Sequence, residues 1–235
     1  MLPCGMPRKR VPILAGERYH VCNRGVERRN VTLEGSDSNH FLQAFLFACA
    51  NTNIDSFQML RNSKEKLLRD FEPISYFGRK LYIPKDPITI PIAFTLNPNH
   101  HHLLLESVID GGVSQTLQRL GGYTSYFNTK YDRTGALFQG RSKIIHVDSD
   151  DYLLHLSVYA GRNDRVHGIG ADEQHLVRTS WPEYESGERG ICKKEAILEH
   201  FKGPEEYRAY AEAVLLDIRK HKQMERDARS LGLDD

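Results

Sequence analysis

The stretch "NPNHHHLLLE", Asn97 to Glu106, places three consecutive histidines directly before three leucines. The apolar run predicts a β-strand that begins just after Pro98, because proline cannot donate a hydrogen bond within a sheet. Side chains alternate between the two faces of a strand, so His100 and His102 share one face and His101 points to the other. The stretch therefore predicts a pair of imidazoles at the start of a strand.

The residues on either side of this strand predict a regular succession of strands and helices. Apolar and β-branched segments indicate strands, and apolar residues that recur every three or four positions indicate helices. Gly121 and Gly122 permit a break in the second helix, because each costs about 1 kcal/mol relative to alanine. The predicted strands span residues 18–25, 88–96, 99–106 and 142–149, and the predicted helices span residues 36–52, 113–133 and 148–163.

The order of these elements, βαββαβα, predicts an α+β fold of the ferredoxin-like type. We expect an antiparallel sheet with its helices on one face, and we expect Pro91 to place its strand near an edge or a bulge. Residues 60–87 form a charged insertion without a clear pattern. Residues 1–185 would form one domain, and residues 186–235 would form a helical C-terminal extension that Gly203-Pro204 divides into two helices.

The overall composition is that of an ordinary soluble protein. The chain has 235 residues and a formal net charge of +1, and its four cysteines are scattered, which argues against a zinc knuckle or a dense disulfide framework. No apolar run approaches the roughly 20 residues that span a bilayer, and the N-terminus lacks the apolar core of a secretion signal. We therefore expect an intracellular protein that does not enter a membrane.

Nucleic-acid binding cannot be predicted from the total charge and has to rest on local clusters of basic residues. Two such clusters, "PRKR" (7–10) and "NRGVERRN" (23–30), lie in the first thirty residues. A third, "QGRSK" (139–143), supplies Arg141 and Lys143. Taken singly, each cluster favours a plain solvated surface over a binding site.

The histidine pair has two interpretations, as partly buried imidazoles bonded to the backbone or as metal ligands. Helix 148–163 offers both a nucleophile and a third ligand, because Tyr159 and Asn163 are four residues apart and would project from one helical face. Of the eleven tyrosines, only Tyr159 has such a polar partner on a predicted helix. Tyr159 could instead be a packing residue, and His155 could accept its proton or face solvent.

The motif "NPNHHHLLLE" resembles the histidine-hydrophobe-histidine strand of the HUH single-strand DNA transposases. Further segments resemble the branch of REP-associated tyrosine transposases, in the same order along the chain: "YHVCNRG", "YTSYFNTKYDRTGALFQGRSK", "VDSDDYLLHLSVYAGRNDRVHG" and the "SW" at Ser180-Trp181. The likeness covers most of residues 19–181. It implies the HUH endonuclease fold for the predicted domain 1–185.

By this resemblance His100 and His102 would bind a divalent metal, Asn163 would be the third ligand and Tyr159 would be the nucleophile. The implied cofactor is Mg²⁺ or Mn²⁺, without ATP or an organic cofactor. The implied partner is single-stranded or hairpin DNA with a REP-like palindrome, which would be cleaved and transferred through a covalent 5′-phosphotyrosine. The implied setting is the bacterial cytoplasm, in association with the nucleoid, with a monomer or a homodimer as the active unit.

The sequence departs from the family pattern near both halves of the predicted site. The middle residue of the histidine motif is usually apolar but here is His101. The tyrosine is usually followed by Ile-x-x-Asn-Pro, whereas here Ala160 follows it and Asp164 replaces the proline. The insertion 60–87 falls where the family often has a short connection. Because the chemical positions are retained, these departures concern the choice of substrate more than the reaction.

Single-stranded DNA needs cations for its phosphates and aromatic planes for its bases. The predicted DNA-contacting residues are Arg24, Arg119, Tyr126, Arg141 and Lys143.

Three other functions remain open: a replication or conjugation nickase that uses the same site, a domesticated DNA-binding protein without turnover, and a metal-dependent hydrolase with water as nucleophile.

Overall fold

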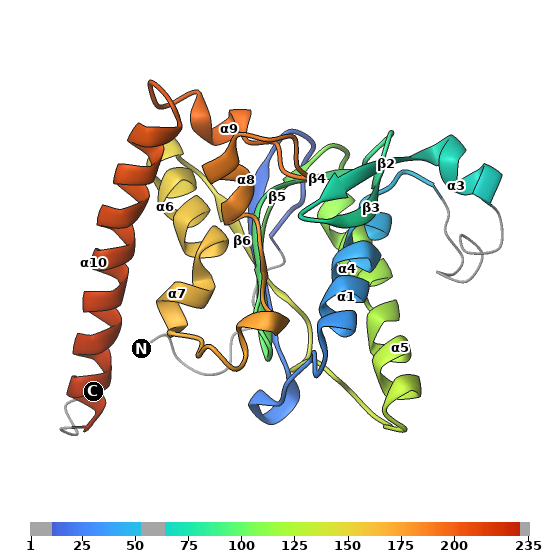
Figure 1. Ribbon diagram of the computed structural model, residues 1–235, viewed down its shortest axis with the longest axis horizontal. Coiled ribbons are helices and arrows are strands. Elements are labelled where there is room, and N and C mark those ends of the chain that lie inside the picture. The colour runs from blue at the N-terminus through green and yellow to red at the C-terminus, as the bar shows by residue number, and fades with distance from the viewer. Residues whose placement is uncertain (1–10, 53–63, 231–235) are drawn as a thin grey trace.

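The computed structural model describes residues 11–52 and 64–230, which fold around a five-stranded sheet (Figure 1). The basic residues 8–10 lie outside the described part. The strand order is β6-β1-β5-β4-β7, and every neighbouring pair is antiparallel. The first four of these strands have the ferredoxin-like order, so the predicted fold class is confirmed. The strands are β1 (Arg18–Arg24), β4 (Thr89–Leu96), β5 (His100–Ser107), β6 (Lys143–Val147) and β7 (Arg178–Thr179).

Helices cover both faces of the sheet, so the expectation of helices on one face was wrong. In Figure 1, α1 (Gly35–Ala48), α4 (Gly112–Leu120) and α5 (Gly122–Lys130) lie on one side, and α6 (Asp150–Gly161) and α10 (Pro204–Ser230) lie on the other. The reason lies in the strand sequences. Leu103 and Leu105 enter the core beneath α1, whereas Leu104 enters the core beneath α6. A strand that is apolar on both faces needs cover on both faces.

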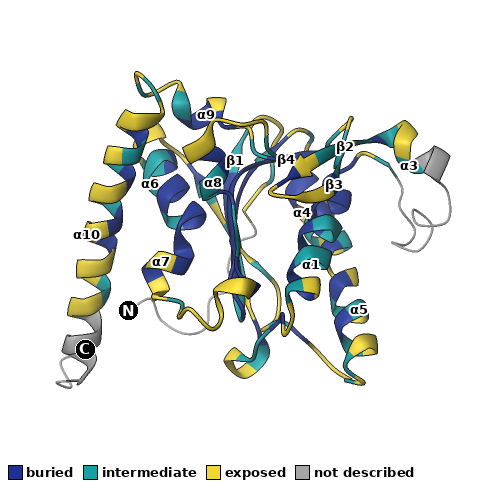
Figure 2. Cartoon of the chain, viewed as in Figure 1, coloured by how far each residue is buried: buried dark blue, intermediate teal, exposed yellow. Residues whose placement is uncertain are grey.

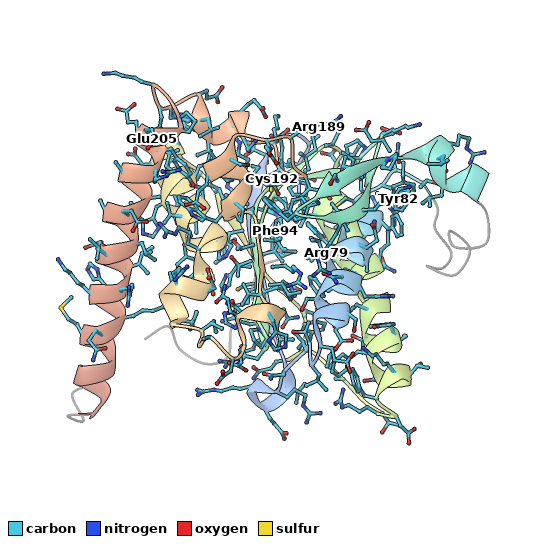
Figure 3. All side chains as sticks on the ribbon, in the orientation of Figure 1. Arg79, Tyr82, Phe94, Arg189, Cys192 and Glu205 are labelled. Atoms are coloured by element: carbon cyan, nitrogen blue, oxygen red, sulfur yellow. The ribbon has the colours of Figure 1, made fainter. Side chains whose placement is uncertain are left out.

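Strand β4 confirms the expectation for Pro91. The pairing of β4 with β5 shifts between Pro91 and Ala93, which marks a β-bulge. The strand lies between β5 and β7, but β7 pairs only with Thr95 and Leu96, so Pro91 has a partner strand on one side alone. Its Phe94, labelled near the middle of the molecule in Figure 3, is 1% exposed.

The predicted helix 113–133 is two helices that meet at Gly121, where the glycine pair permits a break. A Cβ atom at Gly121 would lie 2.9 Å from the carbonyl oxygen of Gln118, closer than ordinary packing allows. The local approach of the two backbone segments therefore requires glycine at this position.

The insertion contains a short helix and a hairpin, α3 (Lys64–Asp70), β2 (Phe71–Tyr76) and β3 (Arg79–Pro84). Phe77 and Gly78 form its turn with positive φ angles of 46° and 74°. Tyr76 and Leu81 are buried in the core beneath α1. The hairpin therefore packs against α1 as a separate two-stranded sheet and does not extend the main sheet.

Helix α6 ends before Asn163, so Tyr159 and Asn163 do not share one continuous helix as predicted. Arg162 has φ −125° and ψ 29°, and Asn163 begins the separate helix α7 (Asn163–His167). Two hydroxyl groups take the last carbonyl groups of α6: Thr95 donates to Ala160 at 2.5 Å, and Thr179 donates to Gly161. These side chains from the sheet satisfy acceptors that the helix leaves unpaired at its end.

Most of the chain after residue 180 packs on the α6 side of the sheet, whereas Ile191 enters the core on the α1 side. This segment forms α8 (Trp181–Ser186), α9 (Glu195–Leu198) and α10. Two short 3₁₀ turns, η1 (Val26–Arg28) and η2 (Gln174–Leu176), lie earlier in the chain. Helices α9 and α10 are separate, as the Gly203-Pro204 pair predicts. The buried face of α10 belongs to the same core as Leu104 (Figure 2). The domain boundary at residue 185 stays a prediction.

Among the described residues, no helix has the length and apolar character that crossing a membrane requires.

Candidate active site

The three histidines of the opening stretch alternate between the faces of β5 as predicted. His100 and His102 lie on the face that α6 covers, with their ring centres 5.4 Å apart. His101 is 2% exposed and lies in the opposite core, against the rings of Phe41 and Phe138. The first two are therefore available to one site, and His101 is not.

His100 lies between two amide oxygen atoms. Its Nδ1 is 2.6 Å from Oδ1 of Asn99, and its Nε2 is 2.8 Å from Oδ1 of Asn163. The amide nitrogen of Asn97 lies 2.9 Å from the same Nε2 and donates to Oδ1 of Asn163 at 2.9 Å. The structure therefore joins the start of β5 to the start of α7, although α6 ends two residues before Asn163.

His102 is held by a histidine that the sequence did not single out. Nε2 of His20, on β1, lies 2.9 Å from Nδ1 of His102, and the two rings stack at 5.1 Å between centres. This contact occupies Nδ1 of His102 and leaves its Nε2 as the nitrogen that could bind a metal ion. The local signal was weak, because His20 stands alone in its strand and only the pairing of β1 with β5 brings it to His102.

Tyr159 packs edge-on against this histidine pair. Its ring centre lies 5.0 Å from that of His102 and 5.9 Å from that of His20, with the planes nearly perpendicular in both cases. Its helix contacts β5 directly. The structure thus brings Tyr159, His100, His102 and Asn163 to one face of the sheet.

Two more side chains reach this place from the C-terminal part of the chain. Nζ of Lys222, on α10, lies 3.0 Å from Nε2 of His167 and 5.5 Å from the ring centre of Tyr159. The His167 ring lies 4.7 Å from that of His100. Sequence reasoning missed both residues, since no spacing within α10 or α7 points to a partner elsewhere in the chain.

Burial keeps the histidines of this site neutral at ordinary pH. It lowers the pKa of His20 to about 4 and holds the pKa of His102 well below the usual value. The pKa of His100 is also lowered, first by burial and then by the positive charges of Lys222 and Arg24, and its hydrogen bond to Oδ1 of Asn163 opposes this shift. Neutral imidazole is the form that binds a metal ion.

The donor set around His100 fits a divalent cation. A neutral imidazole carries one N–H, yet both nitrogens of His100 face an amide oxygen, at 2.6 Å and 2.8 Å. One of these contacts therefore brings two acceptors together, and a cation bound beside them would satisfy both. Adjacent ligands of an octahedral Mg²⁺ ion lie about 2.9 Å apart, which matches the separation of Nε2 and Oδ1 of Asn163.

Two further observations agree with a hydrated cation. Oδ1 of Asn97 is buried and has no hydrogen-bond partner among the described residues, so a water molecule on a bound ion would donate to it. The second nitrogens of His100 and His102 are held by Asn99 and His20, as is usual for ligating histidines. Among the described residues, no group of three or more His, Cys, Asp or Glu side chains could hold a metal, so the set depends on the amide of Asn163.

Three of the predicted DNA-contacting residues lie on the exposed surface around or leading to this site. Arg24 is the β1 residue opposite His100, and its Nε donates to Oε1 of Gln139 at 2.9 Å. Lys143 is opposite Cys22 on β6, and its alternation places it on the same face as His102. Arg141 is exposed in the segment that leads into β6.

Arg119 and Tyr126 lie on the other side of the sheet, in α4 and α5. Nη1 of Arg119 donates to the carbonyl groups of Ala48 and Ala50 at the end of α1. Tyr126 stacks on His40 at 3.5 Å between ring centres and donates to Oδ1 of Asp37 at 3.2 Å. The structure does not bring these two residues to the histidine site.

His155 is half-buried on α6. Burial lowers its pKa, and the negative charge of Asp217 on α10 opposes that shift. The side chain therefore interacts with the C-terminal helix.

No protein-family model and no curated protein matches the chain. Among solved structures, it is similar to that of a REP-associated tyrosine transposase bound to a REP hairpin. The two are 17% identical, the match covers 79% of this chain and 90% of that chain, and the TM-score is 0.42.

Proposed function

We propose that this chain is a metal-dependent transesterase that cleaves and joins single-stranded or hairpin DNA through Tyr159. The observation that carries the proposal is the meeting of Tyr159 with His100, His102 and Asn163 on one face of the sheet. Metal-dependent phosphodiester transfer requires a nucleophile and a bound cation, and these four side chains would supply the nucleophile and three metal ligands.

His100, His102 and Asn163 would hold Mg²⁺ or Mn²⁺. Bound there with open positions, the ion would polarise a phosphate and stabilise charge on the oxygen atoms that enter and leave. His20 and Asn99 would fix the ring orientations of the two histidines through the contacts at 2.9 Å and 2.6 Å.

Tyr159 would attack the phosphorus atom of the DNA backbone. A bond forms between its phenolic oxygen and phosphorus, the bond to the 3′-oxygen breaks, and the phenolic proton is lost as the free 3′-hydroxyl gains one. The product is a 5′-phosphotyrosine, which a 3′-hydroxyl of another strand can attack in the reverse sense. The two neutral rings of His102 and His20 fix the plane of the tyrosine from its sides.

The DNA would approach over the exposed surface that carries Arg24, Arg141 and Lys143, where phosphates meet cations before any base is read. Arg119 and Tyr126 are outside this surface, because they bind α1 on the other side of the sheet. The ordered sequence likeness to REP-associated transposases supports a hairpin with a flanking single strand as substrate, and DNA transposition as the purpose.

The proposal competes with a nickase, a DNA-binding protein without turnover and a hydrolase that uses water. Incubation with hairpin-bearing oligonucleotides of both strands, with Mn²⁺ or Mg²⁺, followed by a denaturing gel separates them. A covalent protein–DNA band excludes the hydrolase and the non-catalytic protein. Transfer of the bound fragment to a second oligonucleotide then distinguishes strand transfer from simple nicking.

A further inference from the structure

The C-terminal helix is fixed firmly on the helix that carries Tyr159. Tyr207, Ala211, Leu215 and Ile218 recur every three or four residues along α10 and are all buried against the α6 side. The hydroxyl of Tyr207 lies 2.9 Å from that of Ser157 on α6. A pair of charged groups, Arg162 and Glu212, adds a contact at 2.5 Å.

Lys222 continues this buried stripe, four residues after Ile218, and its amine reaches the candidate site. Nζ lies 3.0 Å from Nε2 of His167 and 5.5 Å from the ring centre of Tyr159. The His167 ring in turn lies 4.7 Å from that of His100. These contacts involve α7, α6 and β5, so the amine lies among the residues that surround the nucleophile.

We propose that Lys222 is a catalytic residue of strand transfer, which binds the scissile phosphate beside Tyr159, with His167 as its positioning residue. The inference rests on the proposed function and adds a role for the C-terminal helix.

The charge balance of the site favours this role. A phosphodiester carries one negative charge and gains another as the deprotonated phenolic oxygen attacks, so a cation beside the nucleophile stabilises it in addition to the proposed metal ion. An ammonium group is a compact positive charge that can donate hydrogen bonds to phosphate oxygens, and the contact with His167 places it beside Tyr159. Lys222 keeps its proton throughout, while phosphorus exchanges its bond to the 3′-oxygen for a bond to the phenolic oxygen.

A purely structural role for Lys222 makes different predictions. If the lysine only ties α10 to α7 through His167, its replacement should lower thermal stability, and the loss of DNA affinity should not depend on the charge of any particular phosphate. Lys222→Met removes the charge and keeps an unbranched chain of helix-forming character. Lys222→Arg keeps the charge, and Lys220→Met on the exposed side of α10 serves as the matched control.

The first measurement is the single-turnover rate of covalent adduct formation on a hairpin oligonucleotide with Mn²⁺. Lys222→Met should slow it by about 100-fold, as for the loss of one donor to a developing charge. Lys222→Arg should retain most of the rate, and Lys220→Met should remain within about twofold of the wild-type rate. Equal rates of adduct formation in Lys222→Met and Lys220→Met would overturn the proposal.

The second measurement needs no turnover. In a Tyr159→Phe background, affinities are measured for a series of oligonucleotides in which one phosphate at a time is a neutral methylphosphonate. At one position the neutral group should weaken binding by about tenfold with Lys222 present and leave binding unchanged with Lys222→Met. The absence of any such position overturns the role of Lys222. If the wild-type protein forms no covalent adduct but shows such a position, the proposed function is refuted and the binding of a phosphate by Lys222 still holds.

Discussion

Nε2 of His20 lies 2.9 Å from Nδ1 of His102, and the two rings stack with their planes 13° apart. A residue of the first strand thereby holds a candidate metal ligand of the fifth, across the centre of the sheet. Because ligating histidines depend on such a partner for their orientation, His20 should control metal affinity without touching the metal.

His20→Leu should weaken Mn²⁺ binding by about 10- to 100-fold, since nothing would then orient the His102 ring. The change is measured by calorimetric titration with Mn²⁺, and excess Mn²⁺ should restore part of the cleavage activity. His20→Gln, whose amide oxygen can accept from Nδ1 of His102, should have a Mn²⁺ affinity between those of the wild-type protein and His20→Leu. An unchanged Mn²⁺ affinity in His20→Leu would remove this residue from the account.

The candidate ligands should respond in a graded way. His100→Ala and His102→Ala should abolish both Mn²⁺ binding and cleavage, because each removes a strong nitrogen donor. Asn163→Ala removes a weaker amide donor, whose position water can take, so high Mn²⁺ should partly restore cleavage. Near-normal activity of His100→Ala, together with inactivity of a folded His101→Val protein, would shift the site by one residue and contradict the register.

His101 should be dispensable for activity, and its buried imidazole should lower the stability of the fold. Both its ring nitrogens are buried and have no hydrogen-bond partner in the described part of the chain, so His101→Leu should raise the free energy of unfolding by about 1 to 2 kcal/mol. His101→Val, which is smaller, should be close to neutral. Urea denaturation at pH 7 measures both changes, with His175→Gln as a control at an exposed position. A destabilised His101→Leu protein would indicate a partner for the imidazole that the structure does not show.

The same histidine should contribute to acid sensitivity. Burial lowers the pKa of His101 to about 3, from a value of 6.5 when unfolded. The unfolded chain therefore binds a proton that the folded protein excludes, and stability falls as the pH drops below about 6.5, by up to about 1.4 kcal/mol per pH unit. His101→Leu should flatten the dependence of unfolding free energy on pH between 6.5 and 5. An equally steep dependence in the variant would show that His101 does not contribute.

Arg141 and Lys143 should contribute to the salt dependence of hairpin binding. Replacement of both by alanine should weaken binding and reduce the slope of log K against log salt by about 1.5, as two phosphate contacts are lost. Arg79→Ala with Lys80→Ala, on the exposed hairpin of the other face, is the matched control. A slope that is the same in both double variants would place the DNA elsewhere.

Local sequence patterns predicted the fold class and singled out His100, His102, Tyr159 and Asn163, and the family resemblance assigned these four residues to one site. Alternation in "HHHLLL" separates His100 and His102 from His101, and the structure has that arrangement. The end of α6 was not predictable, because the hydroxyls of Thr95 and Thr179 that take its last carbonyls come from distant strands.

Contacts between distant segments also explain the residues that were missed. His20 meets His102 across 82 residues, and Lys222 meets His167 across 55. No periodicity within one element carries that information. The cover on both faces of the sheet was in principle readable from three successive leucines in β5, which a strand with one solvated face would not contain.

The central claim is that Tyr159 forms the bond to DNA. The protein is incubated with a hairpin-bearing oligonucleotide and Mn²⁺, digested with nuclease and protease, and mapped by mass spectrometry for a nucleotide-modified tyrosine. We predict the modification on Tyr159, and its loss in Tyr159→Phe with hairpin affinity nearly unchanged, since only the hydroxyl is removed. A nucleotide on another tyrosine, with Tyr152 the first to inspect, or an adduct that persists in Tyr159→Phe, would contradict the account.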